Sequence, residues 1–467
     1  MEMHDKPNFV QILTDDQGWG DLGSFGHQFI QSPHLDRLAE EGLKFTHCYA
    51  ADSVCSPARA AILTGRTPYR NGVYRWIPAN TFCHLPKKEI TLPQLLRSDG
   101  YQTAHFGKWH LGHFTEHKVD ETEDWISTFG QAPDQPNMQD YGYDYWFATG
   151  NVARPNHENP QNFFLNGEAM GKMEGFSAQI VADQLVTWIR GHRKQDQPFF
   201  ITVWFHEPHG PINSDPRFVQ QYEELKDPSL RQYLANITQL DEAVGSVVKA
   251  LKEAGVYDDT LVWYTSDNGP EGPHEYGSFN TSDSPYGRSR SHGSTGGLRG
   301  RKRHTHEGGI RVPGIISWPK GFKEAGVRPG GVCGEPVIGS DIFPTLLELA
   351  GLKPPDQVAL DSSSIVPLLR NEAFERARPL YWRNCFQDFR IALRQGEWKI
   401  LGNSKRTEFK LHNLYIDPRE TSDLSAHEPA LFESMKNALI QYDREVIAEG
   451  PDWWKREENQ RADMPLE

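Results

Sequence analysis

The chain lacks any hydrophobic run long enough to cross a membrane. No stretch approaches the roughly 20 consecutive apolar residues that a spanning helix needs, although 37% of its 467 residues are hydrophobic. Positive charge is also in deficit, because 63 Asp and Glu outnumber 49 Lys and Arg and give a net charge of −14. The missing apolar run argues against membrane insertion, and the charge balance argues against a nucleic-acid partner. The length favours a large globular protein of two domains.

Cysteine is scarce and scattered. The five cysteines include no C-x-x-C pair, so they do not indicate a disulfide framework, and any pairing among them stays open. The first residues also lack the apolar region of a secretion signal. We therefore expect either a cytoplasmic protein or one from which a signal has been removed.

Strand-like and helix-like segments alternate over most of the chain. Near-continuous apolar runs at 9–13, 198–205 and 260–266 are typical of strands that are covered on both faces of a parallel sheet. The pattern predicts a large mixed, mostly parallel α/β sheet with helices on both faces, in a first domain over 1–370. Short alternating strands followed by a helix predict a smaller C-terminal domain over 371–467, with an antiparallel sheet.

Polar residues follow four of the predicted strands. They are Asp15 and Asp16, Lys108 and His110, His206 and His209, and Asp267 and Asn268. Ligands of open α/β sheets bind at the carboxyl ends of the strands, so we expect all four pairs at one edge. Oxygen ligands without a set of soft ligands suit Ca²⁺ or Mg²⁺ better than zinc. A solvated turn is the alternative for each pair taken singly.

Cys55 stands at a predicted helix start. Pro57 suits the first helical turn, which places Cys55 at or near the N-cap, where unpaired amides and the helix dipole favour an anion. Arg59 returns to the same face one turn later and can offer a fork of donors. The alternative is a capped core helix with an incidental buried cysteine.

Two further stretches are candidates for site loops. The run 299–306 is the densest basic cluster in this acidic chain, and glycines that precede a strand favour an internal loop over a nucleic-acid patch. The stretch 113–175 is rich in Pro, Asn and Asp, and its periodicity is weak. We expect a long excursion there with substrate-shaping loops that include Arg154, Asn156 and His157.

The string Cys55-Ser56-Pro57-Ala58-Arg59, followed by Leu63-Thr64-Gly65-Arg66, resembles the C-x-P-x-R signature of type I sulfatases. Further segments resemble that family's motifs in the family's order, in both parts of the chain; they are 8–26, 107–112, 266–270, 307–313, 394–399 and 414–418. The resemblance implies an alkaline phosphatase-like fold with the catalytic site in the first domain and a C-terminal domain that contributes to the substrate cleft. The chain is most similar to sulfatases that act on sugar sulfates, such as N-acetylgalactosamine-6-sulfatase and bacterial polysaccharide sulfatases.

The resemblance implies a metal and a modified nucleophile. Asp15, Asp16, Asp267 and Asn268 would hold one Ca²⁺ together with residue 55. Cys55 would be oxidised to formylglycine and be present as its hydrate. One hydroxyl of the hydrate would attack sulfur to give a covalent sulfate on the enzyme, and the second would expel sulfate, which a thiol could not do.

The resemblance also assigns catalytic roles. Arg59 would hold the hydrate, and His110 would assist its deprotonation. Lys108 and Lys302 would neutralise the sulfate oxygens, and His206 would protonate the leaving alcohol. The residues expected to bind or position the substrate are Arg154, His157, His209, Arg301 and His304, with His306 as a further candidate.

These assignments predict a sulfatase that hydrolyses a carbohydrate sulfate ester. Its implied partner, besides the sulfated sugar, is a formylglycine-generating or anaerobic maturation enzyme, and its implied location is periplasmic, secreted or lysosomal. The alternatives are an arylsulfatase, a phosphonate or phosphate monoester hydrolase of the same superfamily, and a glycan-binding relative that lacks the modification.

Overall fold

The computed structural model describes residues 6–450 apart from 79–80, 115–131, 133, 273–289 and 387. Within these residues the centre is an eleven-stranded sheet of order β10-β2-β9-β8-β1-β7-β3-β4-β5-β6, with β11 paired to β2. Its strands are β1 (Asn8–Thr14), β2 (Leu43–Tyr49), β3 (Gln102–Lys108), β4 (Tyr145–Thr149), β5 (Phe164–Leu165), β6 (Glu168–Ala169), β7 (Phe199–Trp204), β8 (Thr260–Ser266), β9 (Arg311–Ser317), β10 (Gly331–Cys333) and β11 (Val337–Ile338). The run β8-β1-β7-β3-β4 is parallel throughout, whereas β9 is antiparallel to both its neighbours. The predicted mixed, mostly parallel sheet is confirmed.

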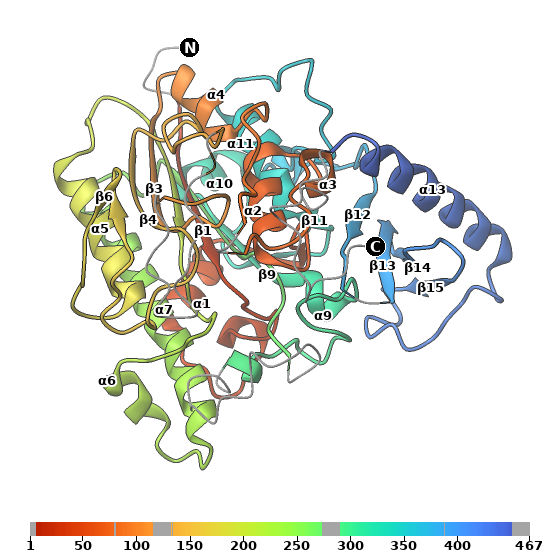
Figure 1. Cartoon of the computed structure of the whole chain (residues 1–467), viewed down its shortest axis with the longest axis horizontal. Helices are drawn as coiled ribbons and strands as arrows, with labels where there is room; N and C mark the ends of the chain where they lie inside the picture. Colours follow the sequence, from red (N-terminus) through yellow and green to blue (C-terminus); the bar gives the residue numbers. More distant parts are fainter. Residues whose placement is uncertain are drawn as a thin grey trace.

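Helices cover both faces of this sheet (Figure 1). On one face lie α2 (Cys55–Thr64), α4 (Leu92–Ser98) and α11 (Ile342–Leu349), and on the other α1 (Pro33–Glu41), α5 (Ser177–Gly191) and α7 (Pro228–Glu253). In β1, Phe9 packs into the first layer and Val10 into the second. Because both faces are buried, the strand needs apolar side chains at successive positions, which explains the continuous run in the sequence.

Local signals set the helix ends. Asp227 precedes α7, and its side chain accepts hydrogen bonds from the backbone N–H groups of Ser229 and Leu230, while Pro228 occupies the first turn. Helix α2 ends at Gly65, whose φ of 68° is left-handed. The shorter helices are α3 (Pro68–Asn71), α6 (Pro216–Val219), α9 (Glu307–Ile310), α10 (Pro319–Ala325) and α12 (Val366–Leu369).

A second, four-stranded antiparallel sheet lies beside the first (Figure 1, blue). It consists of β12 (Leu380–Arg383), β13 (Phe389–Gln395), β14 (Trp398–Asn403) and β15 (Phe409–Asn413), and α13 (Pro429–Ile447) packs on one of its faces. From the opposite face Trp382 and Ala392 pack against Tyr49 and Ala61 of the first unit. The predicted boundary at residue 370 directly follows α12 and stays a prediction.

The stretch 113–175 differs from its expectation. Strand β4 pairs in parallel with β3, and β5 and β6 follow it in antiparallel order, so part of this stretch belongs to the central sheet. Sequence periodicity missed β4 because it is short and rich in aromatic residues between turn-forming Asp and Gly. Residues 115–131 of the same stretch lie outside the described part of the chain.

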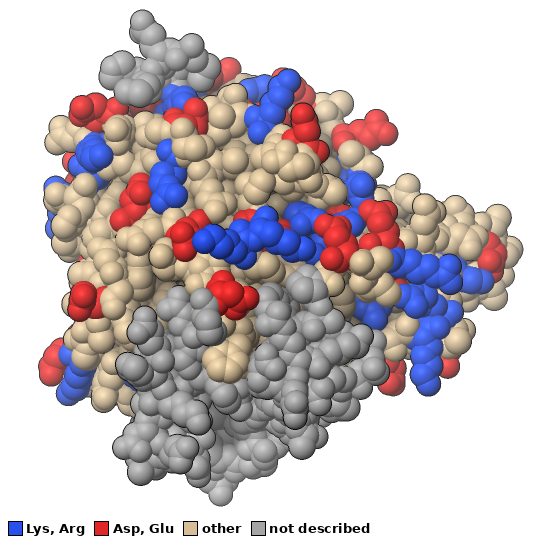
Figure 2. Space-filling model, turned by 45° about the horizontal axis from the view of Figure 1, so that its top comes forward, with Lys and Arg blue, Asp and Glu red and all other residues tan. Residues whose placement is uncertain are grey.

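The surface and the helices agree with the bulk composition. Among the described residues no helix combines the length and the hydropathy that a bilayer span requires. On the face shown in Figure 2, Lys and Arg side chains stand beside Asp and Glu in a band across the middle.

Candidate active site

Neighbouring parallel strands bring the predicted polar residues to one edge of the sheet. Strand β1 pairs with β7 on one side and β8 on the other, so Asp15 and Asp16 leave the sheet between the ends of those strands. Backbone hydrogen bonds between these neighbouring segments continue beyond the ends of the strands. The N–H of Asp15 donates to the carbonyl of Glu207 at 3.1 Å, and that of Asp267 donates to the carbonyl of Thr14 at 3.0 Å.

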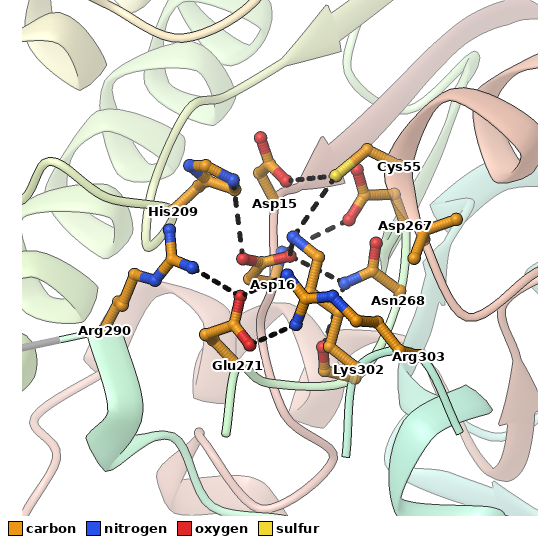
Figure 3. A network of polar contacts seen from close by, with 12 residues as sticks. Asp15, Asp16, Cys55, His209, Asp267, Asn268, Glu271, Arg290, Lys302 and Arg303 are labelled. Atoms are coloured by element: carbon orange, nitrogen blue, oxygen red, sulfur yellow. Dashed lines mark hydrogen bonds and ion pairs between the residues drawn. The ribbon is translucent and has the colours of Figure 1, made fainter. Parts of the chain in front are cut away.

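Cys55 is the first residue of α2 and faces Asp15 (Figure 3). Its thiol donates to Oδ1 of Asp15 at 3.2 Å, and Nζ of Lys302 lies 3.6 Å from the sulfur. Burial raises the pKa of this thiol well above its usual value, and Asp15 and Asp267 raise it further, while the nearby lysines offset only part of the effect. The side chain is therefore a protonated thiol at neutral pH, which is a poor nucleophile.

Arg59 ties the helix to the strand ends. Its Nε and Nη2 donate to Oδ2 of Asp267 at 3.0 and 2.7 Å, and its Nη1 donates to the carbonyl of Lys108 at 3.0 Å. The guanidinium lies 5.2 Å from the centre of the Trp204 ring and is fully buried. In this arrangement Arg59 orients Asp267, and its predicted contact with a hydrated residue 55 stays a prediction.

Two buried lysines pair with the aspartates that follow β1. Nζ of Lys108 contacts Oδ2 of Asp15 at 2.5 Å, and Nζ of Lys302 pairs with Oδ1 of Asp16. Although burial raises the pKa of Asp15, the positive charges around it, Lys108 first, hold that pKa well below its ordinary value. Three cations, Arg59 included, thus face the three carboxylates of Asp15, Asp16 and Asp267 in a buried, polar site.

The oxygen donors of this cluster fit a hard cation. One ligand atom from each of Asp15, Asp16, Cys55 and His209 lies within 4.8 Å of the others. Oδ2 of Asp16 and Oδ1 of Asn268 are buried and accept no hydrogen bond from the described residues. Buried oxygens without a donor are costly, and a divalent cation would satisfy both.

Two family models match the chain. One described as Sulfatase covers residues 7–352, and one described as N-sulphoglucosamine sulphohydrolase, C-terminal, covers residues 300–445. The first match alone extends over well more than half of the chain.

The chain belongs to the sulfatase family.

Named relatives agree with this assignment. N-acetylgalactosamine-6-sulfatase of Rattus norvegicus is 30% identical over 423 residues, which cover 84% of this chain and 71% of the relative. Arylsulfatase A of Homo sapiens is 32% identical over 446 residues, which cover 91% of this chain and 80% of the relative. The crystal structure of Ps i-CgsB in complex with k-i-k-neocarrahexaose shares the fold, with a TM-score of 0.80 and 24% identity. The match covers 96% of this chain and 94% of that structure's chain. The predicted alkaline phosphatase-like fold and sulfuric ester hydrolase activity are confirmed.

Two histidines of this sulfatase each have one ring nitrogen without a hydrogen-bond partner among the described residues. Nε2 of His110 lies 2.9 Å from the carbonyl of Ile77, which can only accept, so Nε2 carries the proton and Nδ1 is a free acceptor. Nε2 of His206 lies 2.8 Å from Thr149 Oγ1, whose hydroxyl donates to the Asn151 carbonyl. Thr149 therefore accepts from His206, whose Nδ1 is also without a partner among the described groups.

The protonation of these rings bears on their predicted roles. Burial lowers the pKa of both His110 and His206 well below the usual value; Lys108 adds to the effect at His110, and His157 does so at His206. Both rings are neutral in this state of the protein. A neutral ring can act as a base, which is the role predicted for His110. To act as an acid, His206 must first take up a proton on Nδ1.

The substrate-positioning candidates separate into two groups. His209 is beside Asp16, with its Nε2 3.7 Å from Oδ2, and His157 lies 3.6 Å from Glu207, next in the chain to His206. Arg301 instead donates to the carbonyl of Glu271, and the ring of His304 lies beside that of His306. Arg154 and Asn156 are half-buried before His157.

Sequence reasoning missed Glu271 and its partners. Glu271 pairs with Arg290 and with Arg303, and these ion pairs lie directly beside Lys302 (Figure 3). The attraction of these arginines outweighs burial and holds the pKa of Glu271 well below its usual value. The signal that was available is position, since Glu271 follows Asp267 and Asn268 by a few residues at the same strand end. Thr149 was also missed, because it is the last residue of strand β4, which the sequence did not predict.

Proposed function

We propose that this chain hydrolyses the sulfate ester of a carbohydrate, with Ca²⁺ bound at the aspartate cluster and Cys55 converted to formylglycine. The observation that carries the proposal is the position of Cys55, which lies between a carboxylate of the cation site and the ammonium group of Lys302. Its thiol is buried and protonated, so the unmodified side chain does not suit nucleophilic attack.

The chain's own groups have definite tasks in this scheme. Formylglycine, as its hydrate, supplies a hydroxyl that attacks sulfur and a second one that later releases sulfate. His110 offers the unprotonated Nδ1 that accepts a proton from the nucleophile. Lys108 and Lys302 neutralise charge that builds on the sulfate oxygens, and Arg59 fixes the Asp267 carboxylate. His206 takes up a proton and delivers it to the leaving oxygen.

The residues that hold the cation would be Asp15, Asp16, Asp267, Asn268 and the side chain at position 55. Ca²⁺ is preferred over Mg²⁺ because it accepts a larger and less regular set of oxygens. A bound Ca²⁺ would lend positive charge to a site whose carboxylates and basic groups otherwise balance, which favours an anionic substrate.

The carbohydrate class rests on similarity and is part of the proposal. A relative at 30% identity is an N-acetylgalactosamine-6-sulfatase, and a protein of the same fold was crystallised with a neocarrahexaose. A maturation enzyme that oxidises Cys55 is then the implied protein partner. A periplasmic, secreted or lysosomal location follows from the same reasoning.

Mass spectrometry of the peptide that contains Cys55, from protein made in its native host, tests the nucleophile. The proposal expects the mass of formylglycine at position 55, and an intact cysteine in all of the protein would refute it. Turnover of methylumbelliferyl sulfate and methylumbelliferyl phosphate then separates a sulfatase from a phosphate monoester hydrolase. A panel of sulfated galactosamine, glucosamine, galactose and fucose tests the carbohydrate class; turnover of aryl sulfate alone would favour an arylsulfatase.

A further inference from the structure

The hydroxyl group of Thr149 is in direct contact with the ring of His206. Thr149 is the last residue of β4, and its Oγ1 lies 2.8 Å from Nε2 of His206. The hydroxyl proton is committed to the carbonyl of Asn151 at 2.6 Å. The hydroxyl oxygen can therefore only accept from the imidazole, which keeps a proton on Nε2 whether or not Nδ1 is protonated.

The surroundings of His206 hold its ring in this orientation. Only 1% of the residue is exposed, and the ring of Phe163 packs against the imidazole at a centroid distance of 5.5 Å and an angle of 80°. Phe163 is in turn stacked on Phe147 of β4, with the two ring centroids 4.5 Å apart. Strand β4 and the segment that follows it thus supply both a hydrogen-bond acceptor and an apolar wall for this imidazole.

The same end of β4 also holds the backbone of His110, the predicted base. The N–H of Trp109 donates to the carbonyl of Thr149 at 2.9 Å, and the N–H of His110 donates to the carbonyl of Gly150 at 3.0 Å. The hydroxyl that contacts His206 and the carbonyl that fixes His110 therefore belong to consecutive residues. Thr149 has a fixed place relative to both histidines.

The contact decides which ring nitrogen of His206 can serve a leaving group. In the neutral ring Nε2 carries the proton, and Nδ1 has no partner among the described residues. When Nδ1 takes up a proton, Nε2 keeps its hydrogen bond to Thr149, so the ring does not have to turn over between the two states. Without the hydroxyl, the Nε2–H of the protonated ring would be buried with no acceptor, which is costly.

We propose that Thr149 is a positioning residue for the departure of the alcohol, and that its hydroxyl fixes Nδ1 of His206 as the atom that donates the proton. This inference rests on the proposed function and deepens it. As the bond from sulfur to the alcohol oxygen breaks, its electron pair stays on that oxygen, which takes the proton from Nδ1. Sulfur remains bonded to the nucleophile at position 55, and the ring of His206 returns to the neutral form with its proton on Nε2.

The test compares leaving groups of different basicity on the formylglycine-bearing enzyme. The substrates are 4-nitrophenyl sulfate, whose phenolate leaves readily without a proton, and phenyl sulfate, whose more basic phenolate benefits from one. Thr149→Val removes the hydroxyl with little change of shape. Its kcat/KM is expected to fall by less than about threefold for 4-nitrophenyl sulfate and by about 10- to 100-fold for phenyl sulfate, part of the contribution of general acid catalysis.

Two further variants at the same position separate the hydroxyl from the shape of the side chain. Thr149→Ser keeps the hydroxyl and is expected to restore the wild-type ratio of the two kcat/KM values. Thr149→Ala lacks it and is expected to change the ratio as Thr149→Val does. Because this ratio does not depend on the fraction of the enzyme that is folded or carries formylglycine, a partly unstable variant still gives a valid answer.

Thr103→Val is the matched control. Thr103 is a buried threonine at the other end of β3 from Lys108, and its hydroxyl likewise donates to a carbonyl, that of Gly142 at 2.6 Å. This variant is expected to lower Tm to a similar extent and to keep the wild-type ratio.

The possible failures are distinguishable. If Thr149→Val slows both esters by the same factor, or if Thr149→Ser does not restore the ratio, Thr149 does not position the acid and the sulfatase function stands. If the wild-type enzyme with formylglycine hydrolyses no sulfate ester, the role of Thr149 and the proposed function both fail.

Discussion

Three consecutive basic residues, Arg301, Lys302 and Arg303, have different partners in the folded chain. Arg301 donates to the carbonyl of Glu271, and Arg303 pairs with its carboxylate. Lys302 alone of the three extends to Asp16 and Cys55. The structure thus selects one residue of the run for contact with Cys55, the proposed nucleophile, a distinction that a motif alignment shifted by one position would lose.

This distinction predicts unequal losses of activity. Lys302→Met removes the ammonium group that would face developing charge, and kcat/KM for methylumbelliferyl sulfate is expected to fall by about 100-fold or more. Arg301→Gln keeps Lys302 in place and is expected to cost less than tenfold. Steady-state kinetics of both variants, each checked for formylglycine, would decide. An equal loss in the two variants would remove Lys302 from its assigned role.

Asp241 offers a pH test away from the active site. Burial raises the pKa of this carboxyl to about 7, although the backbone N–H groups of His34 and Leu35 donate to it and lower the pKa. Between about pH 4 and 7 the unfolded chain has lost this proton while the folded chain keeps it. The unfolded state then binds fewer protons, so stability from this group falls as the pH rises, by at most about 1.4 kcal/mol per pH unit.

Asp241→Asn removes that titration but also one acceptor for the α1 amides. The variant is therefore expected to melt below the wild type at pH 4, and the difference in Tm is expected to shrink or reverse by pH 8. Thermal unfolding of both proteins across this range measures it. A difference that stays constant with pH would show that Asp241 is ionised in the folded protein throughout.

At the scale of elements, a buried ionic cluster joins the two sheets. Nζ of Lys399, on β14, lies 2.9 Å from Glu307 at the start of α9 and 2.9 Å from Glu420. Tyr49 on β2 donates to Glu307 at 2.7 Å, and the Glu307 N–H donates to Glu420 at 2.8 Å. The loop that contains Lys302 is thus anchored by the C-terminal sheet.

Lys399→Met should be strongly destabilising, because it leaves two buried carboxylates without their shared cation. The expected loss is about 3–5 kcal/mol in the free energy of unfolding, measured by denaturant titration. Lys405→Met, at an exposed position after the same strand, is the control and is expected to change stability little. Adding Glu420→Gln to Lys399→Met should recover part of the loss. Full stability of the single variant would contradict the role given to the cluster.

The sequence predicted elements better than it predicted loops. Buried strands such as β8 are visible as unbroken apolar runs, and the rule for strand ends correctly places Asp15 beside Asp267. The partners of Glu271 could not be predicted, because they depend on how the 299–309 loop folds back on itself. Periodicity could not reveal β4 either, because a short aromatic segment is compatible with both a strand and a loop.

At the scale of the whole molecule, the cation is expected to couple activity to stability. Removal of the proposed Ca²⁺ with a chelator should abolish turnover and lower Tm, since the buried oxygens of Asp16 and Asn268 would lose their partner. Returning Ca²⁺ to about 100 times its Kd should restore about 2.7 kcal/mol of stability. Differential scanning calorimetry with and without Ca²⁺ measures this. A Tm that is unaffected by the chelator and by added Ca²⁺ would argue against a cation at this position.

The burial of Cys55 has a consequence for the timing of synthesis. Cys55 and Lys302 are 247 residues apart, so at about 5–20 residues per second roughly 12–50 s separate their emergence from the ribosome. Asp267 likewise emerges long after Cys55. In the finished fold only 2% of Cys55 is exposed, which leaves no room for an oxidising enzyme. The proposed conversion of Cys55 would therefore belong to the interval before Lys302 and Asp267 reach it.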